Sequence, residues 1–388
     1  MSDRRHFLKQ LALLGTVAVS PFSVAWGQNE SASSPAVPSA DGQFAVSYGN
    51  IRTRKPARKI TVPDVGEYKV LKGDFHIHTV FSDGAVMPQA RVAEAVDNGL
   101  DVISITDHIE YRPNFGGNSI KLLDKNDDFN IAYDLAKPEA DKQNLILVRG
   151  VEITKNIMPP GHFNALFIKD ANSIAAVVDD WRKMLAVAVE QGGFIHWNHP
   201  GAIASFGFKA GEPMQFMAEH EEAYKNGHIH GIEIFNGSSY YPGVSQWCEE
   251  RNLAVIANSD VHASEWNTYG DQNPLRPMTL IFAKERTHDS VKEAFFARRT
   301  VGFAAGMVLG PREWLEKLFA ACITMTPKPG LLELVNNSDI PCFVQAGGAV
   351  HELPALGRLS IYRSDSLKKL TVSNWLVGVN QPLEIALG

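Results

Sequence analysis

Nine side chains of the types that bind metal ions occur at intervals along the 388-residue chain. They are His76, His78, Asp83, His108, Glu152, His162, His199, Asp260 and His262. Side chains at positions i and i+2 of an extended strand point the same way, so His76 and His78 could grip one ion from one face. Asp260 and His262 repeat this spacing. Imidazole nitrogen and carboxylate oxygen together suit zinc, manganese or iron, and no cysteine lies near these residues in the sequence.

Short apolar runs of strand type alternate with helical patterns from about residue 71 onward. Strands are predicted at 102–106, 145–151, 163–168, 193–197, 232–235, 254–258 and 279–283, and helices at 88–98, 173–190, 213–226, 242–252 and 288–299. This alternation predicts a parallel sheet, and seven or eight such units favour a closed barrel. In a barrel the chemistry collects at the carboxyl ends of the strands. His108, Glu152, His199, Asp260 and His262 all follow or end such strands.

Six motifs carry a family resemblance, and they occur in the order of the family. They are Asp-Phe-His-Ile-His-Thr-Val-Phe-Ser-Asp-Gly from Asp74, Ile-Thr-Asp-His, Gly-Val-Glu-Ile, Gly-His-Phe, Asn-His-Pro-Gly and Asn-Ser-Asp-Val-His. Over roughly residues 71–300 they resemble the PHP (polymerase and histidinol phosphatase) superfamily. The resemblance implies an α/β fold, a distorted (β/α)7 PHP-type barrel. A helix near 311–321 and a tail of short apolar runs predict a small C-terminal β-rich domain.

The resemblance also implies two or three divalent transition metals. One ion would be held by His76, His78, Glu152 and Asp260, a second by Glu152, His162 and His199, and a third by Asp83, His108 and His262. A metal-bridging hydroxide, held by Glu152 and neighbouring ligands, would attack phosphorus. Asp107, beside His108, is expected to orient a ligand rather than to be one. Some family members have histidine where Asp83 stands, so metal preference at that site is open.

Longer matches resemble an exported bacterial branch, similar to organophosphate phosphodiesterases. They are the stretch from His76 to Gly84, the stretch from Gly99 to Pro113, Phe282 to Arg286, and Asn337 to Pro341. We therefore expect a metal-dependent phosphodiesterase acting on a small phosphate ester. A phosphomonoesterase, of the histidinol phosphatase or nucleotide phosphatase kind, is the nearest alternative. A non-catalytic metal-binding module and a metal-dependent amidohydrolase are the others.

Several further polar residues have less specific signals. Tyr111, Arg112, Lys155 and Tyr240 follow predicted strands on loops expected to face the site, where they could contact substrate. His196 is an alternative ligand in place of His199. His228 and His230 precede a strand, so we expect structural roles for them at the opposite end of the barrel. His6, His220, His288 and His351 are expected on the surface.

The N-terminal segment predicts export. Arg4 and Arg5, followed by Phe7-Leu8-Lys9 and an apolar run from Leu11 to Val24, resemble a twin-arginine signal. An attached membrane anchor is the alternative, although this run falls short of the ~20 residues that span a bilayer. The expected protein is periplasmic or secreted, is delivered by the twin-arginine machinery and has no transmembrane segment after signal removal. The expected domains are a signal at 1–27, a flexible linker at 28–50, the barrel at 51–310 and the C-terminal domain at 311–388.

Charge limits the expected binding partners, and cysteine content limits the expected disulfides. The net charge of −6 becomes −8 once residues 1–27 are removed, since Arg4, Arg5, Lys9 and Asp3 leave with them. An acidic protein is poorly suited to a stable nucleic-acid partner, because phosphate backbones are bound largely by lysine and arginine. The three cysteines, Cys248, Cys322 and Cys342, predict no disulfide framework, with a Cys322–Cys342 bridge left open.

Overall fold

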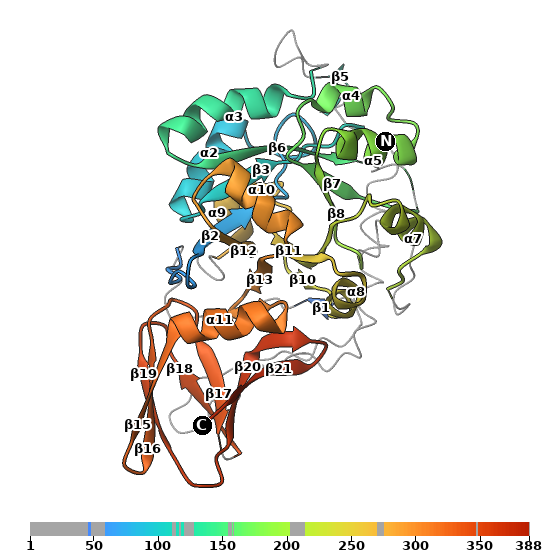
Figure 1. Ribbon diagram of the computed structural model, residues 1–388. Coiled ribbons are helices and arrows are strands. Elements are labelled where there is room, and N and C mark those ends of the chain that lie inside the picture. Colours follow the sequence, from blue (N-terminus) through green and yellow to red (C-terminus); the bar gives the residue numbers. More distant parts are fainter. Residues whose placement is uncertain are drawn as a thin grey trace, which may run out of the picture. The chain divides into compact units, whose positions relative to one another are not determined.

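Strands and helices alternate as expected in the computed structural model, which describes residues 59–110, 128–153, 157, 159–201, 214–269, 275–346 and 348–387 and the backbone of strands at 46–47, 114–115 and 118–119 (Figure 1). All lie in one compact unit, residues 33–388. The helices are α2 (Pro88–Asp97), α3 (Ile131–Lys142), α4 (Ala171–Ala175), α5 (Trp181–Glu190), α7 (Ala218–Lys225), α8 (Gly243–Arg251), α9 (Glu265–Tyr269), α10 (His288–Phe296) and α11 (Arg312–Cys322).

The strands of the first part of the chain are β1 (Val46–Ser47), β2 (Lys69–Asp74), β3 (Val102–Ile105), β4 (Asn114–Phe115), β5 (Asn118–Ser119), β6 (Ile146–Ile153), β7 (Phe163–Leu166), β8 (Phe194–Trp197), β9 (Gly231–Asn236), β10 (Ser239–Tyr240), β11 (Ala254–Asn258) and β12 (Met278–Ala283). Those that follow are β13 (Thr300–Ala304), β14 (Met307–Leu309), β15 (Ile323–Lys328), β16 (Leu331–Asn336), β17 (Cys342–Ala346), β18 (Ala349–Leu353), β19 (Arg358–Tyr362), β20 (Lys369–Gly378) and β21 (Gln381–Ala386).

The central sheet is mainly parallel. β2 pairs with β3, β3 with β6, β8 with β9 and β9 with β11, all in parallel. Every residue of β3, β8, β9 and β11 is buried, which explains their continuous apolar character. The expectation of a parallel sheet is wrong for β12, which runs antiparallel to β2 and β13, and for β7, which runs antiparallel to β6 and β8. Only residues 154–162 join β6 to β7, fewer than the dozen or so that a parallel crossover requires.

Backbone hydrogen bonds join the segment that follows β2 to the segment that follows β11. The Asp260 amide donates to the His76 carbonyl at 2.9 Å, and the His78 amide donates to the Val261 carbonyl at 3.1 Å. The two motifs with ligand types at i and i+2 therefore lie side by side. A fully closed seven-unit barrel stays a prediction from the family resemblance.

The helices pack on the sheet through apolar faces. α2 and α3 lie side by side along β3 and β6 (Figure 1). The helix expected over 173–190 is two helices, α4 and α5, because the Asp180 side chain accepts hydrogen bonds from the amides of Arg182 and Lys183 and starts α5 anew. Helix α3, which contains Pro138, was not expected from the sequence.

The end of the chain is rich in β-structure, as the sequence predicts. Strands β15, β16 and β19 form one antiparallel sheet, whereas β17 pairs with β18 and β20, and β20 pairs with β21. Strand β20 also pairs in parallel with β14, which connects this region to the central sheet. The boundary expected between residues 310 and 311 stays a prediction.

Other expectations about the whole chain have mixed outcomes. Cys248, Cys322 and Cys342 are buried free thiols, so no Cys322–Cys342 bridge is present. Among the described residues, no helix is both long and apolar enough to cross a membrane. The signal at 1–27 and most of the linker at 28–50 lie outside the described residues.

The surface position expected for His220 is wrong. Its ring is fully buried and stacks on Trp197, with ring centroids 3.7 Å apart. Its Nε2 donates to the Pro160 carbonyl at 2.7 Å, and its Nδ1 accepts from the Met217 amide at 3.2 Å. Helix α7 carries few apolar residues, and its sequence therefore gives no sign that this histidine faces inward. Burial lowers the pKa of His220 from 6.5 to about 4.

We expect His220 to make stability fall as the pH falls from about 6.5 to 4. Neutral His220 is favoured in the folded state, so the unfolded chain binds the extra proton in this interval, and folding loses up to about 3 kcal/mol. In His220→Gln, which cannot titrate, this part of the loss should be absent. Urea unfolding of both proteins at several pH values measures it, and parallel pH curves would contradict the assignment.

Candidate metal centre

The structure brings together all nine side chains that the sequence singles out. They come from six places in the fold: the segment after β2, the segment after β3, strand β6, the residue before β7, the segment after β8 and the segment after β11. Eight of them form four overlapping groups of three. Within each group, the ligand-type atoms lie within 4.8 Å of one another. His262 joins them, since its ring stacks on His78 and its Nε2 lies 3.3 Å from Asp83 Oδ1.

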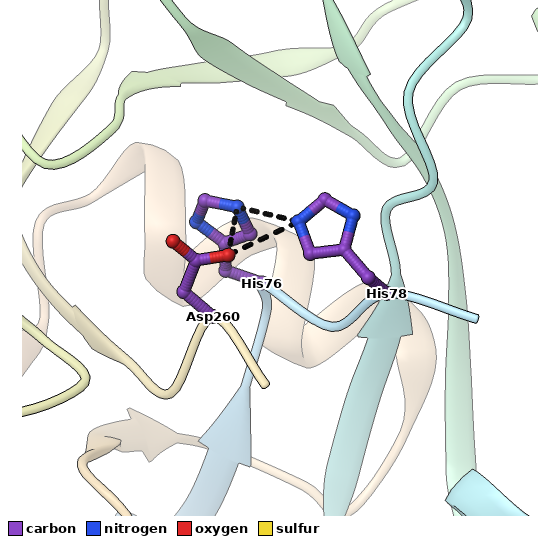
Figure 2. A group of neighbouring side chains, drawn as sticks. All are labelled: His76, His78 and Asp260. Carbon is purple, nitrogen blue, oxygen red and sulfur yellow. Dashed lines mark hydrogen bonds and ion pairs between the residues drawn. The ribbon is translucent and has the colours of Figure 1, made fainter. Parts of the chain in front are cut away.

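The central group contains His76, His78 and Asp260, which point toward one another in Figure 2. The two histidine Nε2 atoms are 3.1 Å apart, and each lies 3.1 Å from Asp260 Oδ1. Glu152 Oε2 lies 3.3 Å from His76 Nε2 and 3.2 Å from His78 Nε2. Two ligands bound 2.0–2.2 Å from one ion are roughly 2.8–3.6 Å apart at octahedral to tetrahedral angles. The spacing of these atoms therefore fits a shared divalent ion.

Glu152 links this group to a second one through its other oxygen. Glu152 Oε1 lies 2.9 Å from His162 Nδ1 and 3.5 Å from His199 Nε2. Its Oε2 also lies 3.3 Å from His108 Nδ1. One carboxylate is thus within reach of five imidazole rings, as expected for a side chain placed between two ions.

Asp83 is the centre of a third group. Its Oδ2 lies 3.4 Å from His108 Nε2, and its Oδ1 lies 3.3 Å from both His262 Nε2 and His78 Nδ1. The side chains of Asp83 and His262 are 24% and 41% exposed, whereas those of His76, His78 and Glu152 are at most 1% exposed. The cluster is therefore open to solvent on the side of Asp83 and His262.

The electrostatics of the cluster favour positive charge. Burial disfavours protonation of His78, but Asp260 and Glu152 outweigh it and raise the pKa of His78 to about 9. The pKa of His76 is raised well above its usual value in the same way. Burial opposes ionisation of Glu152 and Asp260, yet the surrounding imidazoles hold the pKa of both carboxyls well below the usual range. Divalent cations would satisfy the same carboxylates.

Two residues of the cluster have a left-handed backbone, which is uncommon outside glycine. The φ angle is 52° at Asp260 and 27° at His199. Hydrogen bonds from the amides of both residues, to the His76 carbonyl and to Glu233 Oε2, hold them there. Such strain persists where the surroundings determine the conformation and is typical of functional sites.

Two buried charged residues that support the site were missed in the sequence. Glu233 lies in β9 and accepts hydrogen bonds from His76 and His199. A glutamate within the apolar strand Gly231–Asn236 is the signal that could have revealed it. Arg91 of α2 donates from Nε to the His78 carbonyl at 2.9 Å and from its terminal nitrogens to the carbonyls of Val261, His262 and Ala263.

Asp107 lies where it can orient a ligand. It accepts from the Thr79 amide at 2.7 Å and from the Ser82 hydroxyl at 2.6 Å. That hydroxyl lies 3.3 Å from His78 Nδ1, so Asp107 is connected to His78 through Ser82. Asp107 belongs to none of the four groups of potential ligands.

The four residues expected to contact substrate have different outcomes. Tyr111, Arg112 and Lys155 lie outside the described residues. Tyr240 lies in β10 rather than on a loop, and it is 1% exposed with its ring stacked on Phe235.

Histidines near β8 and β9 also differ in role. His196 is fully buried outside the four groups, and neither ring nitrogen has a hydrogen-bond partner among the described residues. Nδ1 of His230 accepts from the Ile195 amide at 3.0 Å, which is consistent with a structural role.

Known proteins resemble this chain over the region that holds the cluster. The PHP domain family matches residues 74–329. A crystal structure from Bacteroides vulgatus, of a two-domain protein described as containing a predicted PHP-like metal-dependent phosphoesterase, is 32% identical, covers 86% of this chain and 99% of that chain, and has a TM-score of 0.76. An uncharacterized protein of Methanocaldococcus jannaschii is 28% identical over 204 residues, which are 50% of this chain and 83% of that protein. The chain belongs to the PHP domain family.

Proposed function

We propose that this protein is an enzyme that hydrolyses phosphate esters, phosphodiesters in preference, with divalent metal ions held by the nine clustered side chains. The observation that carries the proposal is the central group, where His76, His78 and Asp260 place ligand-type atoms 3.1 Å apart. The description of the Bacteroides relative as a predicted metal-dependent phosphoesterase supports the same chemistry.

The side chains would be shared among three sites for zinc, manganese or iron. The first would use His76, His78, Glu152 and Asp260, the second Glu152, His162 and His199, and the third Asp83, His108 and His262. Bound ions would supply the positive charge that offsets repulsion between hydroxide and a phosphate ester, and would ionise water near neutral pH.

The chain's own residues determine where the phosphate can bind. Asp83 and His262 lie on the exposed side of the cluster, so the substrate would approach from there. The buried oxygens of Glu152 would hold the first two sites at a fixed separation. Asp107 would keep His78 oriented through the Ser82 hydroxyl.

The preference for diesters rests on the sequence resemblance, since the longer matches resemble organophosphate phosphodiesterases. Arg112 and Lys155 stay proposed substrate contacts, together with Tyr111 and Tyr240.

We expect the purified protein, reconstituted with manganese, zinc or iron, to release nitrophenol from bis-nitrophenyl phosphate. Chelation should abolish the activity, and re-addition of metal should restore it. In competition, kcat/KM for the diester should exceed that for nitrophenyl phosphate by at least about tenfold, or about 1.4 kcal/mol of transition-state binding.

Other outcomes would favour other functions. A higher kcat/KM for the monoester would indicate a phosphomonoesterase. Stoichiometric metal without hydrolysis of either ester would favour a metal-binding module. Activity that survives complete chelation would contradict metal catalysis.

We also propose export by the twin-arginine route to the periplasm or medium. Fractionation of cells that express the full chain, with and without Arg4→Lys and Arg5→Lys, would test this proposal.

A further inference from the structure

Glu233 is a buried carboxylate that contacts the central group through His76. Its side chain is 0% exposed, in the middle of the buried strand β9. Burying a carboxylate is costly unless it is paired and hydrogen-bonded, so its contacts should account for its presence. Glu233 belongs to none of the four groups of potential ligands.

Four donors from separate chain segments satisfy this carboxylate. Oε1 lies 2.8 Å from His76 Nδ1 and accepts from Asn258 Nδ2 at 2.9 Å. Oε2 accepts from the His199 amide at 2.7 Å and from Asn236 Nδ2 at 2.8 Å. The amide groups and the backbone N–H can only donate in these contacts. Glu233 therefore acts as an acceptor on both oxygens, and His76 Nδ1 donates to it.

The proton on Nδ1 decides which atom of His76 can bind an ion. With Nδ1 donating to Glu233, the lone pair of the neutral ring is on Nε2. That atom is the one that lies 3.1 Å from both His78 Nε2 and Asp260 Oδ1. The contact with Glu233 thus presents the ligand atom on the side where the other ligands are.

The second oxygen of Glu233 acts on the backbone of His199. The hydrogen bond from the His199 amide holds this residue at a φ of 27°, an uncommon conformation for a residue with a side chain. From there His199 Nε2 lies 3.5 Å from Glu152 Oε1. One carboxylate therefore positions a side chain of each of two neighbouring groups.

We propose that Glu233 is a positioning residue, which fixes the tautomer of His76 and the backbone of His199 and so sets the affinity of the centre for divalent cations. This inference rests on the proposed metal-dependent function. Replacing a group that hydrogen-bonds to a metal ligand and orients it typically lowers the metal affinity by about 10–100-fold.

Glu233→Gln tests the inference with little change of shape. Glutamine has one acceptor oxygen, and its amide nitrogen would face either the His76 and Asn258 donors or the His199 and Asn236 donors. With the nitrogen toward His76, that ring loses its acceptor or takes the other tautomer, with the proton on Nε2. With the nitrogen toward His199, the His199 amide loses its acceptor instead. We expect cobalt and zinc affinity, measured by competition with a chromogenic chelator, to fall by about 10–100-fold. The visible spectrum of the cobalt protein should change with it.

Glu333→Gln is the matched control. Glu333 is a strand glutamate too, in β16 of the β-rich end of the chain, where its described ion pair is with Lys328 and not with any of the nine side chains. Its metal affinity should stay within about twofold of the wild type. Equal affinities of the wild type and Glu233→Gln would overturn the inference while leaving the proposed function intact, whereas a wild type that binds no metal would overturn both.

A second measurement covers the case in which Glu233→Gln does not fold. Nitrogen-15 NMR of histidine-labelled, zinc-loaded wild type should show the His76 proton on Nδ1. A proton on Nε2 would overturn the inference without reference to any variant. Glu233→Asp, which keeps the charge but shortens the side chain, should fold and should bind metal with an affinity between those of the wild type and the glutamine variant.

Discussion

Replacing Glu152 by glutamine is expected to lower kcat/KM for a phosphodiester by at least about a thousandfold, which corresponds to about 4 kcal/mol of transition-state stabilisation. Glu152 is buried, and its two oxygens lie within 3.5 Å of five histidine nitrogens. An amide offers one neutral oxygen where the carboxylate shares a charge over two, so one neighbouring group loses its oxygen and the other keeps an uncharged one.

Glu139→Gln, on the solvent side of α3, is the control for the same chemical change far from the site. Its activity should match that of the wild type. Metal content should be measured on the same samples, since we expect Glu152→Gln to bind less metal per chain. A Glu152→Gln protein that retains activity within about tenfold would exclude Glu152 from the catalytic centre.

Arg91→Met is expected to produce the largest loss of stability, about 3–5 kcal/mol. Arg91 is fully buried, and it donates to the carbonyls of His78, Val261, His262 and Ala263 as well as to Glu94. Methionine fills a similar space but donates nothing, so the carbonyls of His78 and Ala263 lose this donor and the Glu94 carboxylate loses its charge partner. The carbonyls of Val261 and His262 keep the donors that they have in the amides of His78 and Ala85. Arg91 then no longer connects the two segments that carry His78 and His262.

Urea unfolding in the presence of a chelator would measure this loss without a contribution from bound metal. Arg182→Met is the matched control, because Arg182 pairs with Glu222 on the surface, where such a pair contributes about 1 kcal/mol or less. If Arg91→Met and Arg182→Met lose similar stability, the buried arginine does not hold the site together.

Much of the site could be predicted because its chemistry is carried by residue types at short, regular spacings. His76 and His78, and Asp260 and His262, stand two residues apart, and the strand before Asp260 begins with the apolar run Ala254 to Ala257. Such features depend on local sequence alone. The β-rich end of the chain was predictable for the same reason, from its short alternating runs.

The errors have local and distant causes. The direction of β7 follows from the short connection after β6, and the break between α4 and α5 follows from the cap at Asp180, so both were readable from nearby sequence. His220 is buried because Trp197 and the Pro160 carbonyl lie against α7. Those two contacts join residues far apart in the chain, and the sequence around His220 does not reveal them.

The sequence by itself determined which side chains could bind ions and the order in which strands deliver them, because ligand chemistry and strand patterns are properties of single residues and short segments. Only the tertiary structure decided that Glu233 contacts His76 and His199, that Arg91 joins the two segments, and that Asp83 and His262 form the open side. Those facts depend on burial and on hydrogen bonds between residues as much as 172 positions apart, which exist only once the chain has folded.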